Sequence, residues 1–281
     1  MLFWILAAAA LLALAAVALY QPLTVVTYRL QSARLPREAH LRLALLSDLH
    51  DAVYEGRQST LTDTVLAQKP DAVLLVGDIF DDRRSHKGGE LLARQLAGKV
   101  PCYYVPGNHE YYTGEAEQLF SLLRDCGVHV LRNRTHLVRM GHANVVLAGL
   151  DDYYRTELDE GYSDQDAREH LAAEVNELPG FRILMVHRPE RILWDNPFAV
   201  DLIVSGHAHG GQWRIPKILN GFYAPGQGFF PKFAGGCFDR GDHHLVVGRG
   251  LSNPTFLPRL FNPPEVVIID LAPAKNKREV K

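Results

Sequence analysis

The sequence predicts an α/β domain that follows one membrane-spanning helix. The first observation is an apolar stretch, residues 1–20, that carries no charged side chain. The second is a series of short apolar runs typical of buried strands, which alternate with amphipathic helical stretches. The third is that each of the five main strand-like runs ends in polar residues. Strands that alternate with helices are typical of layered α/β proteins.

The apolar stretch at residues 1–20 is long enough to cross a bilayer. Twenty helical residues span about 30 Å, the thickness of the hydrocarbon core. A cleaved signal peptide is disfavoured because no Lys or Arg precedes the apolar run, although Ala16-Val17-Ala18 resembles a cleavage site. A buried core helix is a weaker alternative. By the positive-inside rule, the basic residues that follow place the rest of the chain in the cytoplasm; these are Arg29, Arg34, Arg37 and Arg42.

The composition excludes two classes of protein. Of 281 residues, 22% are charged, which is usual for a folded domain rather than a disordered chain. The net charge of -2 lacks the basic bias of a general nucleic-acid-binding protein, so no nucleic-acid partner is expected. The cysteines are odd in number, lack CxxC spacing and are expected to be free thiols rather than disulfides or metal ligands; they are Cys102, Cys126 and Cys237.

The body of the chain divides into a linker, residues 21–40, a domain, residues 41–272, and a polar tail, residues 273–281. The domain contains five strand-like runs with polar ends, at residues 41–50, 71–82, 102–112, 181–189 and 200–211. Helices are expected at residues 59–68, 89–96, 115–126 and 163–178, the last with Ser163 and Asp166 placed as in a capping box. Residues 136–150 are expected to form a hairpin, and two further strands are expected at residues 244–248 and 265–271.

Residues that bind metals lie at the carboxyl end of each strand-like run. They are Asp48, His50, Asp78, Asn108, His187, His207 and His209. Open α/β sheets place their sites at this end of the strands. A single Asp or His here is more often a turn former or a structural residue, but five such elements in order favour a metal site. Glycines precede Asp78, Asn108 and His207, as sharp turns or close backbone approach require.

The mixture of ligand types indicates two metal ions. Carboxylates, imidazoles and one amide, without thiolate, argue against a structural zinc site. Seven ligands suffice for two ions if Asp78 bridges them. Nitrogen and oxygen ligands suit Mn, Fe, Zn, Co or Ni better than calcium, and manganese is the expected metal. Two ions can hold a bridging hydroxide and clamp a phosphate during in-line displacement.

The ordered motifs resemble those of the calcineurin-like metallophosphoesterases over residues 41–271. They are Asp48-Leu49-His50, Gly77-Asp78-Ile79-Phe80-Asp81, Gly107-Asn108-His109-Glu110, His187 and Gly206-His207-Ala208-His209. The resemblance implies a four-layer α-β-β-α sandwich. It also implies one metal held by Asp48, His50, Asp78 and His209, and another held by Asp78, Asn108, His187 and His207. His109 would be the catalytic histidine beside the leaving-group oxygen, oriented by Asp81.

The chain also resembles a narrower branch, the membrane-attached bacterial phosphoesterases with a GHxHGGQ motif. The matching segments include Gly210-Gly211-Gln212, Arg214-Ile215-Pro216, Gly248-Arg249-Gly250-Leu251, Pro258-Arg259 and Pro264-Glu265. Ala208 stands where Thr is usual and Ser252 where Gly is common, and the twin-arginine signal of some relatives is missing. Some members hydrolyse the diphosphate of UDP-2,3-diacylglucosamine in lipid A synthesis. The resemblance therefore implies a single-pass protein of the bacterial inner membrane that acts on a lipid-linked substrate.

The expected reaction is attack of a metal-bridging hydroxide on phosphorus. Arg249 and Arg214 are candidates to bind the substrate phosphate, or else surface residues. In the aromatic segment 221–238, Phe229, Phe230 and Phe233 either contact acyl chains or pack a loop on the core, with packing slightly favoured. Two alternatives stay open for the protein as a whole: a phosphodiesterase or phosphatase for another substrate, and a non-catalytic metal-binding scaffold.

Overall fold

Two six-stranded sheets form the centre of the molecule in the computed structural model, which describes residues 1–192, 196–252 and 257–274. The first sheet has the order β1 (Thr24–Ser32), β14 (Glu265–Pro273), β2 (Leu41–Leu46), β3 (Ala72–Val76), β4 (Cys102–Val105) and β5 (His129–Val130). The second has the order β12 (Gly236–Asp239), β13 (His244–Val247), β9 (Leu202–Ser205), β8 (Phe181–Val186), β7 (Ala143–Leu150) and β6 (Arg134–Met140).

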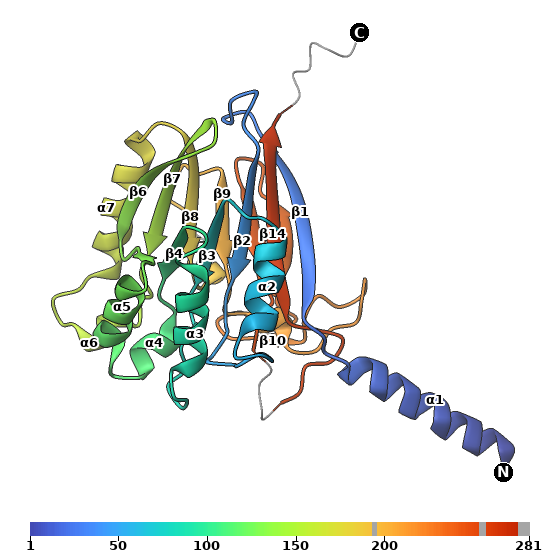
Figure 1. Ribbon diagram of the computed structural model, residues 1–281. Helices are drawn as coiled ribbons and strands as arrows, with labels where there is room; N and C mark the ends of the chain where they lie inside the picture. The colour runs from blue at the N-terminus through green and yellow to red at the C-terminus, as the bar shows by residue number, and fades with distance from the viewer. Residues whose placement is uncertain (193–195, 253–256, 275–281) are drawn as a thin grey trace, which may run out of the picture.

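Helices cover the outer face of each sheet (Figure 1). The first sheet packs against α2 (Ser59–Ala67), α3 (Lys87–Leu96) and α5 (Ala116–Asp125), and the second against α7 (Asp164–Glu177). Shorter elements are α4 (Asn108–Tyr112), α6 (Arg155–Leu158), the 3-10 turns η1 (Pro189–Ile192) and η2 (His209–Gly211), and the hairpin β10 (Tyr223–Ala224) and β11 (Gly228–Phe229). The predicted four-layer sandwich is confirmed.

Strand β3 shows why these apolar runs form central strands. All five of its residues are buried, and alternate side chains enter different cores. Leu74 lies in the core between the two sheets, whereas Leu75 lies in the core between the first sheet and its helices. Parallel strands covered on both faces are expected to be apolar throughout. The parallel pairings of β2 with β3 and of β3 with β4 bring their carboxyl ends to one edge.

The predicted helices and the hairpin are confirmed. Helix α7 begins after Ser163, whose Oγ accepts a hydrogen bond from the backbone N–H of Asp166 at 3.2 Å. Strands β6 and β7 pair in antiparallel register from Arg134 opposite Gly149 to Met140 opposite Ala143.

The expected linker at residues 21–40 contains a strand of the first sheet. Strand β1 pairs in parallel with β14 over its full length, from Thr24 opposite Glu265 to Ser32 opposite Pro273. The linker interpretation did not include this strand, because its partner β14 lies at the other end of the sequence. In the structure β1 covers the edge that β14 would otherwise expose. Strand β14 also extends to Pro273, two residues past the run 265–271. Most of the predicted polar tail, residues 275–281, lies outside the described residues.

Helix α1 (Leu2–Leu19) projects away from the body of the molecule (Figure 1). It is long and apolar enough to cross a membrane, and only Ala18 is buried. Its carboxyl end is fixed to the domain: the N–H of Phe261 donates to the carbonyl of Ala18 at 2.8 Å, and Gln21 Nε2 donates to the carbonyls of Ala18 and Arg259.

Candidate dinuclear metal site

The loops after β2, β3, β8 and β9 bring six of the seven predicted ligands into two groups. Donor atoms within each group lie within 4.8 Å of one another. One group is Asp48, His50 and His209, and the other is Asp78, His187 and His207. The division matches the one implied by the resemblance. The seventh residue, Asn108, follows β4 at the start of α4, and its Oδ1 is buried without a hydrogen-bond partner among the described residues.

Asp78 belongs to the second group and also faces a histidine of the first. Its Oδ2 is 3.0 Å from His187 Nε2 and 3.8 Å from His50 Nε2, so one carboxylate faces an imidazole of each group. The side chain is buried. The carboxylate is therefore within reach of both groups of predicted ligands, and its bridging role stays a prediction.

The backbone at the ligands is unusual. Five of the seven ligand residues have a left-handed backbone, with φ between 46° and 65°; they are Asp48, His50, Asp78, His207 and His209. Residues other than glycine rarely adopt this conformation, which costs about 1–3 kcal/mol each and occurs preferentially at functional sites. Packing of the two sheets and their helices holds these loops in place.

Two glycines allow ligands from different loops to approach. A Cβ atom at Gly77 would lie 2.3 Å from His187 Nδ1, and one at Gly107 would lie 2.2 Å from Asp78 Oδ1. Gly77 also has a φ of 71°, which only glycine adopts readily. The prediction that these glycines serve close backbone approach is confirmed.

Hydrogen bonds orient the ligand imidazoles. The Nδ1–H of His187 donates to the carbonyl of Val76 at 2.9 Å, which leaves Nε2 directed at Asp78. The Nδ1 of His50 lies 3.0 Å from Asp81 Oδ2, which leaves the Nε2 of His50 as the atom that could bind a metal in the first group. Such partners fix the tautomer and ring orientation of metal-binding histidines.

Asp82, not Asp81, is the direct partner of His109. The Nδ1 of His109 lies 2.8 Å from Asp82 Oδ1 but 3.9 Å from the nearest oxygen of Asp81, which instead holds His50. This differs from the predicted role of Asp81. The motif gave no means of choosing between adjacent carboxylates, because the choice depends on how the chain turns after β3. The His109 ring packs edge-on against His50, with ring centroids 4.4 Å apart.

Glu110 is a positioning residue whose role the sequence analysis did not assign. Its buried carboxylate accepts hydrogen bonds from the backbone N–H groups of Gly107, Asp78, Ile79 and Phe80 at 2.7–3.0 Å. It therefore joins the loop after β3 to the loop after β4. The signal was present in the Gly107-Asn108-His109-Glu110 motif, where the acidic residue follows the histidine.

Arg188 is a second residue that the sequence analysis missed, although it directly follows His187. Its side chain is buried beside the second ligand group, with Nη1 3.5 Å from His207 Nε2. Its Nε donates to Asp152 at 2.7 Å, and Nη1 donates to the hydroxyl of Tyr153 at 3.3 Å. A guanidinium held in this way is suited to bind a phosphate oxygen.

Arg249 and Arg214, the predicted phosphate-binding residues, have other partners. The Nε of Arg249 donates to the buried carboxylate of Glu265 at 2.6 Å. Arg214 donates to Asn220 Oδ1 at 2.6 Å and to the carbonyl of Gly210 at 3.3 Å. A Cβ atom at Gly235 would contact both arginine side chains, so the two lie close together. The structure therefore gives both side chains partners within the protein.

The charges of the site are strongly coupled. Burial opposes ionisation of Asp78, but His187 and His50 hold the pKa of this carboxyl well below its usual range. Burial likewise opposes a charge on His187, but the adjacent Asp78 raises the pKa of His187 to about 10. Burial and neighbouring cations hold the pKa values of His207 and His209 well below the usual range, so both imidazoles are neutral near pH 7.

The donor set fits two divalent cations. The Nε2 atoms of His50 and His209 converge to 3.4 Å, and His209 Nε2 lies 3.7 Å from Asp48 Oδ1. Neutral imidazoles and carboxylates without thiolate suit first-row transition metals. The buried and unpartnered Oδ1 of Asn108 is a further oxygen donor of the predicted set.

The sequence model of the calcineurin-like phosphoesterases matches residues 41–211. The chain belongs to this family. It is 32% identical over 210 residues to a zebrafish (Danio rerio) transmembrane protein with a metallophosphoesterase domain, covering 71% of this chain and 47% of that protein. It is 29% identical over 256 residues to an uncharacterised metallophosphoesterase of Aquifex aeolicus, covering 89% of this chain and 92% of that protein. The chain thus spans about half the length of the vertebrate relatives it matches.

One further relative and one solved structure are also similar to the chain. The chain is 27% identical over 246 residues to the Escherichia coli protein named phosphodiesterase YaeI, covering 83% of each chain. Among solved structures, it resembles an NAD nucleotidase of Haemophilus influenzae with a TM-score of 0.51 and 16% identity, covering 75% of this chain and 45% of that one. The structural likeness shows the fold alone.

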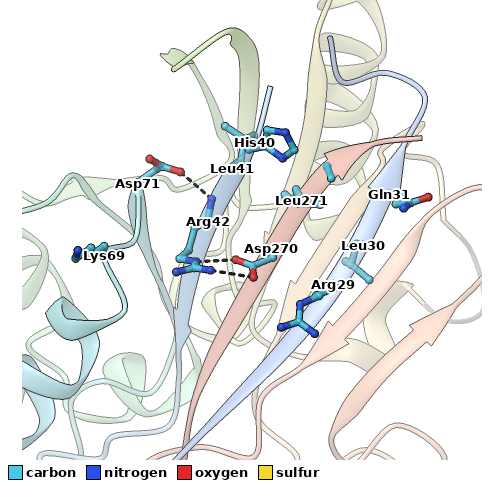
Figure 2. Close-up of a pocket in the computed structure, with 11 residues that line it drawn as sticks. Arg29, Leu30, Gln31, His40, Leu41, Arg42, Lys69, Asp71, Asp270 and Leu271 are labelled. Atoms are coloured by element: carbon cyan, nitrogen blue, oxygen red, sulfur yellow. Dashed lines mark hydrogen bonds and ion pairs between the residues drawn. The ribbon is translucent and has the colours of Figure 1, made fainter. Parts of the chain in front are cut away.

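A cavity elsewhere on the domain is lined by none of the predicted site residues (Figure 2). It has a volume of about 560 Å³ and lies at the amino ends of β2 and β3, the opposite end of these strands from the ligands. Its basic residues include Arg42, whose guanidinium is paired with Asp270 at 2.7 Å and 3.0 Å. The backbone N–H of Arg42 donates to Asp71. This cavity is therefore separate from the metal ligands.

Proposed function

We propose that this protein is a hydrolase of phosphodiester or diphosphate bonds that uses two divalent metal ions. The observation that carries the proposal is the two donor groups that meet at Asp78, with His109 held next to them by Asp82. A scaffold that only binds metal would not need a histidine that a separate carboxylate holds beside the predicted ligands.

Each group of the site has a role in this proposal. The cations, when bound, would activate water and neutralise charge on the phosphate. Arg188 would bind a phosphate oxygen with its guanidinium, which Asp152 and Tyr153 hold in place. His109 would act as an imidazolium: its Nδ1–H would donate to Asp82, and its Nε2 would give a proton to the departing oxygen and leave the ring neutral. Glu110 would keep the loop of Asp78 in position.

The substrate that we propose is a membrane lipid-linked diphosphate such as UDP-2,3-diacylglucosamine. Two features support this choice: helix α1, which is long and apolar enough to cross a membrane, and the Gly206–Gln212 segment of the membrane-attached branch. Residues 1–20 would anchor the chain in a bacterial inner membrane. The domain from β1 to β14 would then lie on the cytoplasmic side, where the basic residues after the anchor favour it.

A second candidate is a phosphodiesterase with broad specificity. The E. coli relative named as a phosphodiesterase favours it, because that chain is similar over 83% of its length. The arrangement of ligands would serve either substrate, since it determines the reacting centre rather than the leaving group.

The test uses the full chain in lipid nanodiscs, freed of metal with a chelator and reloaded with Mn²⁺. We expect Mn²⁺ to restore hydrolysis of bis(p-nitrophenyl) phosphate, and UDP-2,3-diacylglucosamine to be cleaved with a higher kcat/KM. Cleavage of the aryl diester alone would favour the second candidate. Cleavage of neither, by protein shown to hold two Mn²⁺ ions, would overturn the proposal in favour of a metal-binding scaffold.

A further inference from the structure

An apolar cavity of about 400 Å³ adjoins the ligand His209. It is formed by the segment that follows β9, with one contribution from the segment before β14. Besides Ala208, His209 and Gln212, its walls are Trp213, Phe222, Tyr223, Pro225, Phe229 and Leu257. His209 lines the cavity and also belongs to the first donor group, so the cavity adjoins the candidate metal site.

The aromatic walls are held in place by their neighbours. Trp213 and Phe222 are stacked with ring centroids 5.4 Å apart, and Phe229 packs edge-on against both Phe222 and Tyr223. The Nε1–H of Trp213 donates to the carbonyl of Pro258 at 3.0 Å. The polar end of the indole is therefore satisfied by backbone, and its apolar faces remain available to the cavity.

The cavity lies close to the end of helix α1. Leu257, in its wall, precedes by four residues Phe261, whose N–H donates to the carbonyl of Ala18. The carbonyl of Leu257 itself accepts from Gln212 Nε2 at 2.7 Å, which joins this segment to the cavity floor. Helix α1 leaves the domain at the end where β10 lies (Figure 1). The segment 257–261 therefore links one wall of the cavity to the end of α1.

The aromatic segment divides into exposed and buried residues. Phe229 and Phe230 are 66% and 67% exposed, whereas Phe233 is 6% exposed and packs in the core with Phe238. The packing interpretation therefore holds for Phe233, while Phe229 and Phe230 present large apolar surfaces to solvent. Only the first of these two lines the cavity.

We propose that this cavity binds a hydrocarbon chain of the substrate while the phosphate group lies at the metal ligands. The inference rests on the proposed function and adds a site that selects for lipid. A hydrocarbon chain fits the lining better than a nucleobase does, because the walls are almost wholly apolar and a base needs polar partners for its edge. The position beside α1 gives such a chain a route from the bilayer.

Binding of monoalkyl phosphates tests the site without requiring turnover. The probes are butyl, hexyl and octyl phosphate, added to the full Mn²⁺-loaded chain in nanodiscs and measured by calorimetry against empty nanodiscs. We expect affinity to rise about fourfold for each added methylene, from about 0.8 kcal/mol of burial. An affinity that does not change with chain length, once the empty-disc signal is subtracted, would overturn the proposal.

Adjacent phenylalanines provide a matched pair of variants. Phe229→Ala is expected to lower the gain per methylene, whereas Phe230→Ala is expected to retain it, because the two residues are equally exposed and only Phe229 lines the cavity. Leu257→Trp, which narrows the cavity, is expected to weaken octyl phosphate more than butyl phosphate. Thermal unfolding confirms that each variant is folded.

Three outcomes separate this inference from its rivals. Equal losses in Phe229→Ala and Phe230→Ala would overturn it and indicate that both side chains insert into the bilayer. Tighter binding of UMP than of octyl phosphate would overturn it and indicate a nucleotide site. If chain-length dependence is observed but bis(p-nitrophenyl) phosphate is not hydrolysed, the lipid site stands and the proposed reaction fails.

Discussion

The predicted metal ligands and the adjoining aromatic cavity are built in opposite ways. The predicted ligands are mostly buried polar residues on loops that follow central strands of the two sheets, and five of them have a left-handed backbone. The cavity wall is an irregular segment after β9, whose strands β10 and β11 have two residues each and whose apolar side chains are partly exposed. The proposed reacting centre therefore depends on the sheet framework, whereas the proposed lipid site depends on a loop, and loops vary more readily than the elements they connect.

The largest expected effect comes from Asp78→Asn, because this residue faces both donor groups. An amide cannot replace a carboxylate between two cations, and it cannot hold His187 and His50 in the same way. We expect loss of both metal ions and of all measurable hydrolysis, checked by metal analysis of the purified variant. If the variant retains two equivalents of Mn²⁺, Asp78 does not bridge the site.

The next largest effect is expected for His109→Ala. This residue is not one of the seven predicted ligands, so metal content should be normal while kcat falls about 100- to 10,000-fold, the usual contribution of a general acid. The measurement is kcat on bis(p-nitrophenyl) phosphate at full metal occupancy. Normal turnover would remove His109 from the mechanism.

Asp81 and Asp82 provide a sharper comparison between neighbouring residues. Asp82→Asn should reduce kcat by about 100-fold with normal metal affinity, because Asp82 holds His109. Asp81→Asn should instead lower metal affinity about 10- to 100-fold, because Asp81 holds the ligand His50. Titration with Mn²⁺ and kcat at saturation separate the two. The opposite pattern would restore the original prediction that Asp81 orients His109.

Arg249→Ala tests whether this arginine is structural or binds substrate. The substitution leaves the buried Glu265 carboxylate without its partner, so we expect a loss of about 3 kcal/mol in the free energy of unfolding, measured with urea. The kcat/KM for the aryl diester should stay within about twofold of normal, because Arg249 is paired with Glu265 and would not bind the phosphate; loss of a phosphate contact worth about 1.4 kcal/mol would instead lower it about tenfold. A raised KM without loss of stability would show phosphate binding.

The smallest expected effect is a proton released on metal binding. In the metal-free protein His187 is protonated at pH 7, because its pKa is raised to about 10. A metal ion needs the neutral imidazole, so binding should release at least one proton and affinity should rise about tenfold per pH unit between pH 6 and 8. Calorimetry in buffers of different ionisation enthalpy measures this. Binding without proton release would show that His187 is not a ligand.

The sequence predicted which polar residues lie together better than it predicted their neighbours. Asp48, His207 and the other predicted ligands could be placed at one edge because residue type, order and strand ends coincide, and parallel strands bring such ends together. The partner of His109 could not, because Asp81 and Asp82 are adjacent and differ only in the direction set by the turn. Arg188 was missed because nothing in its type separates it from a surface arginine, and β1 because its pairing with β14 spans the whole domain.

The junction between α1 and the domain has a consequence for how substrate is found. Only four residues separate the end of α1 from the start of β1, and the helix end is hydrogen-bonded to the segment 259–261. With α1 in a bilayer, the domain could not rotate freely on a tether, and its cavity would be kept at one height above the lipid surface. Encounter with a lipid then becomes a search in two dimensions, in which a high local concentration replaces strong binding from solution.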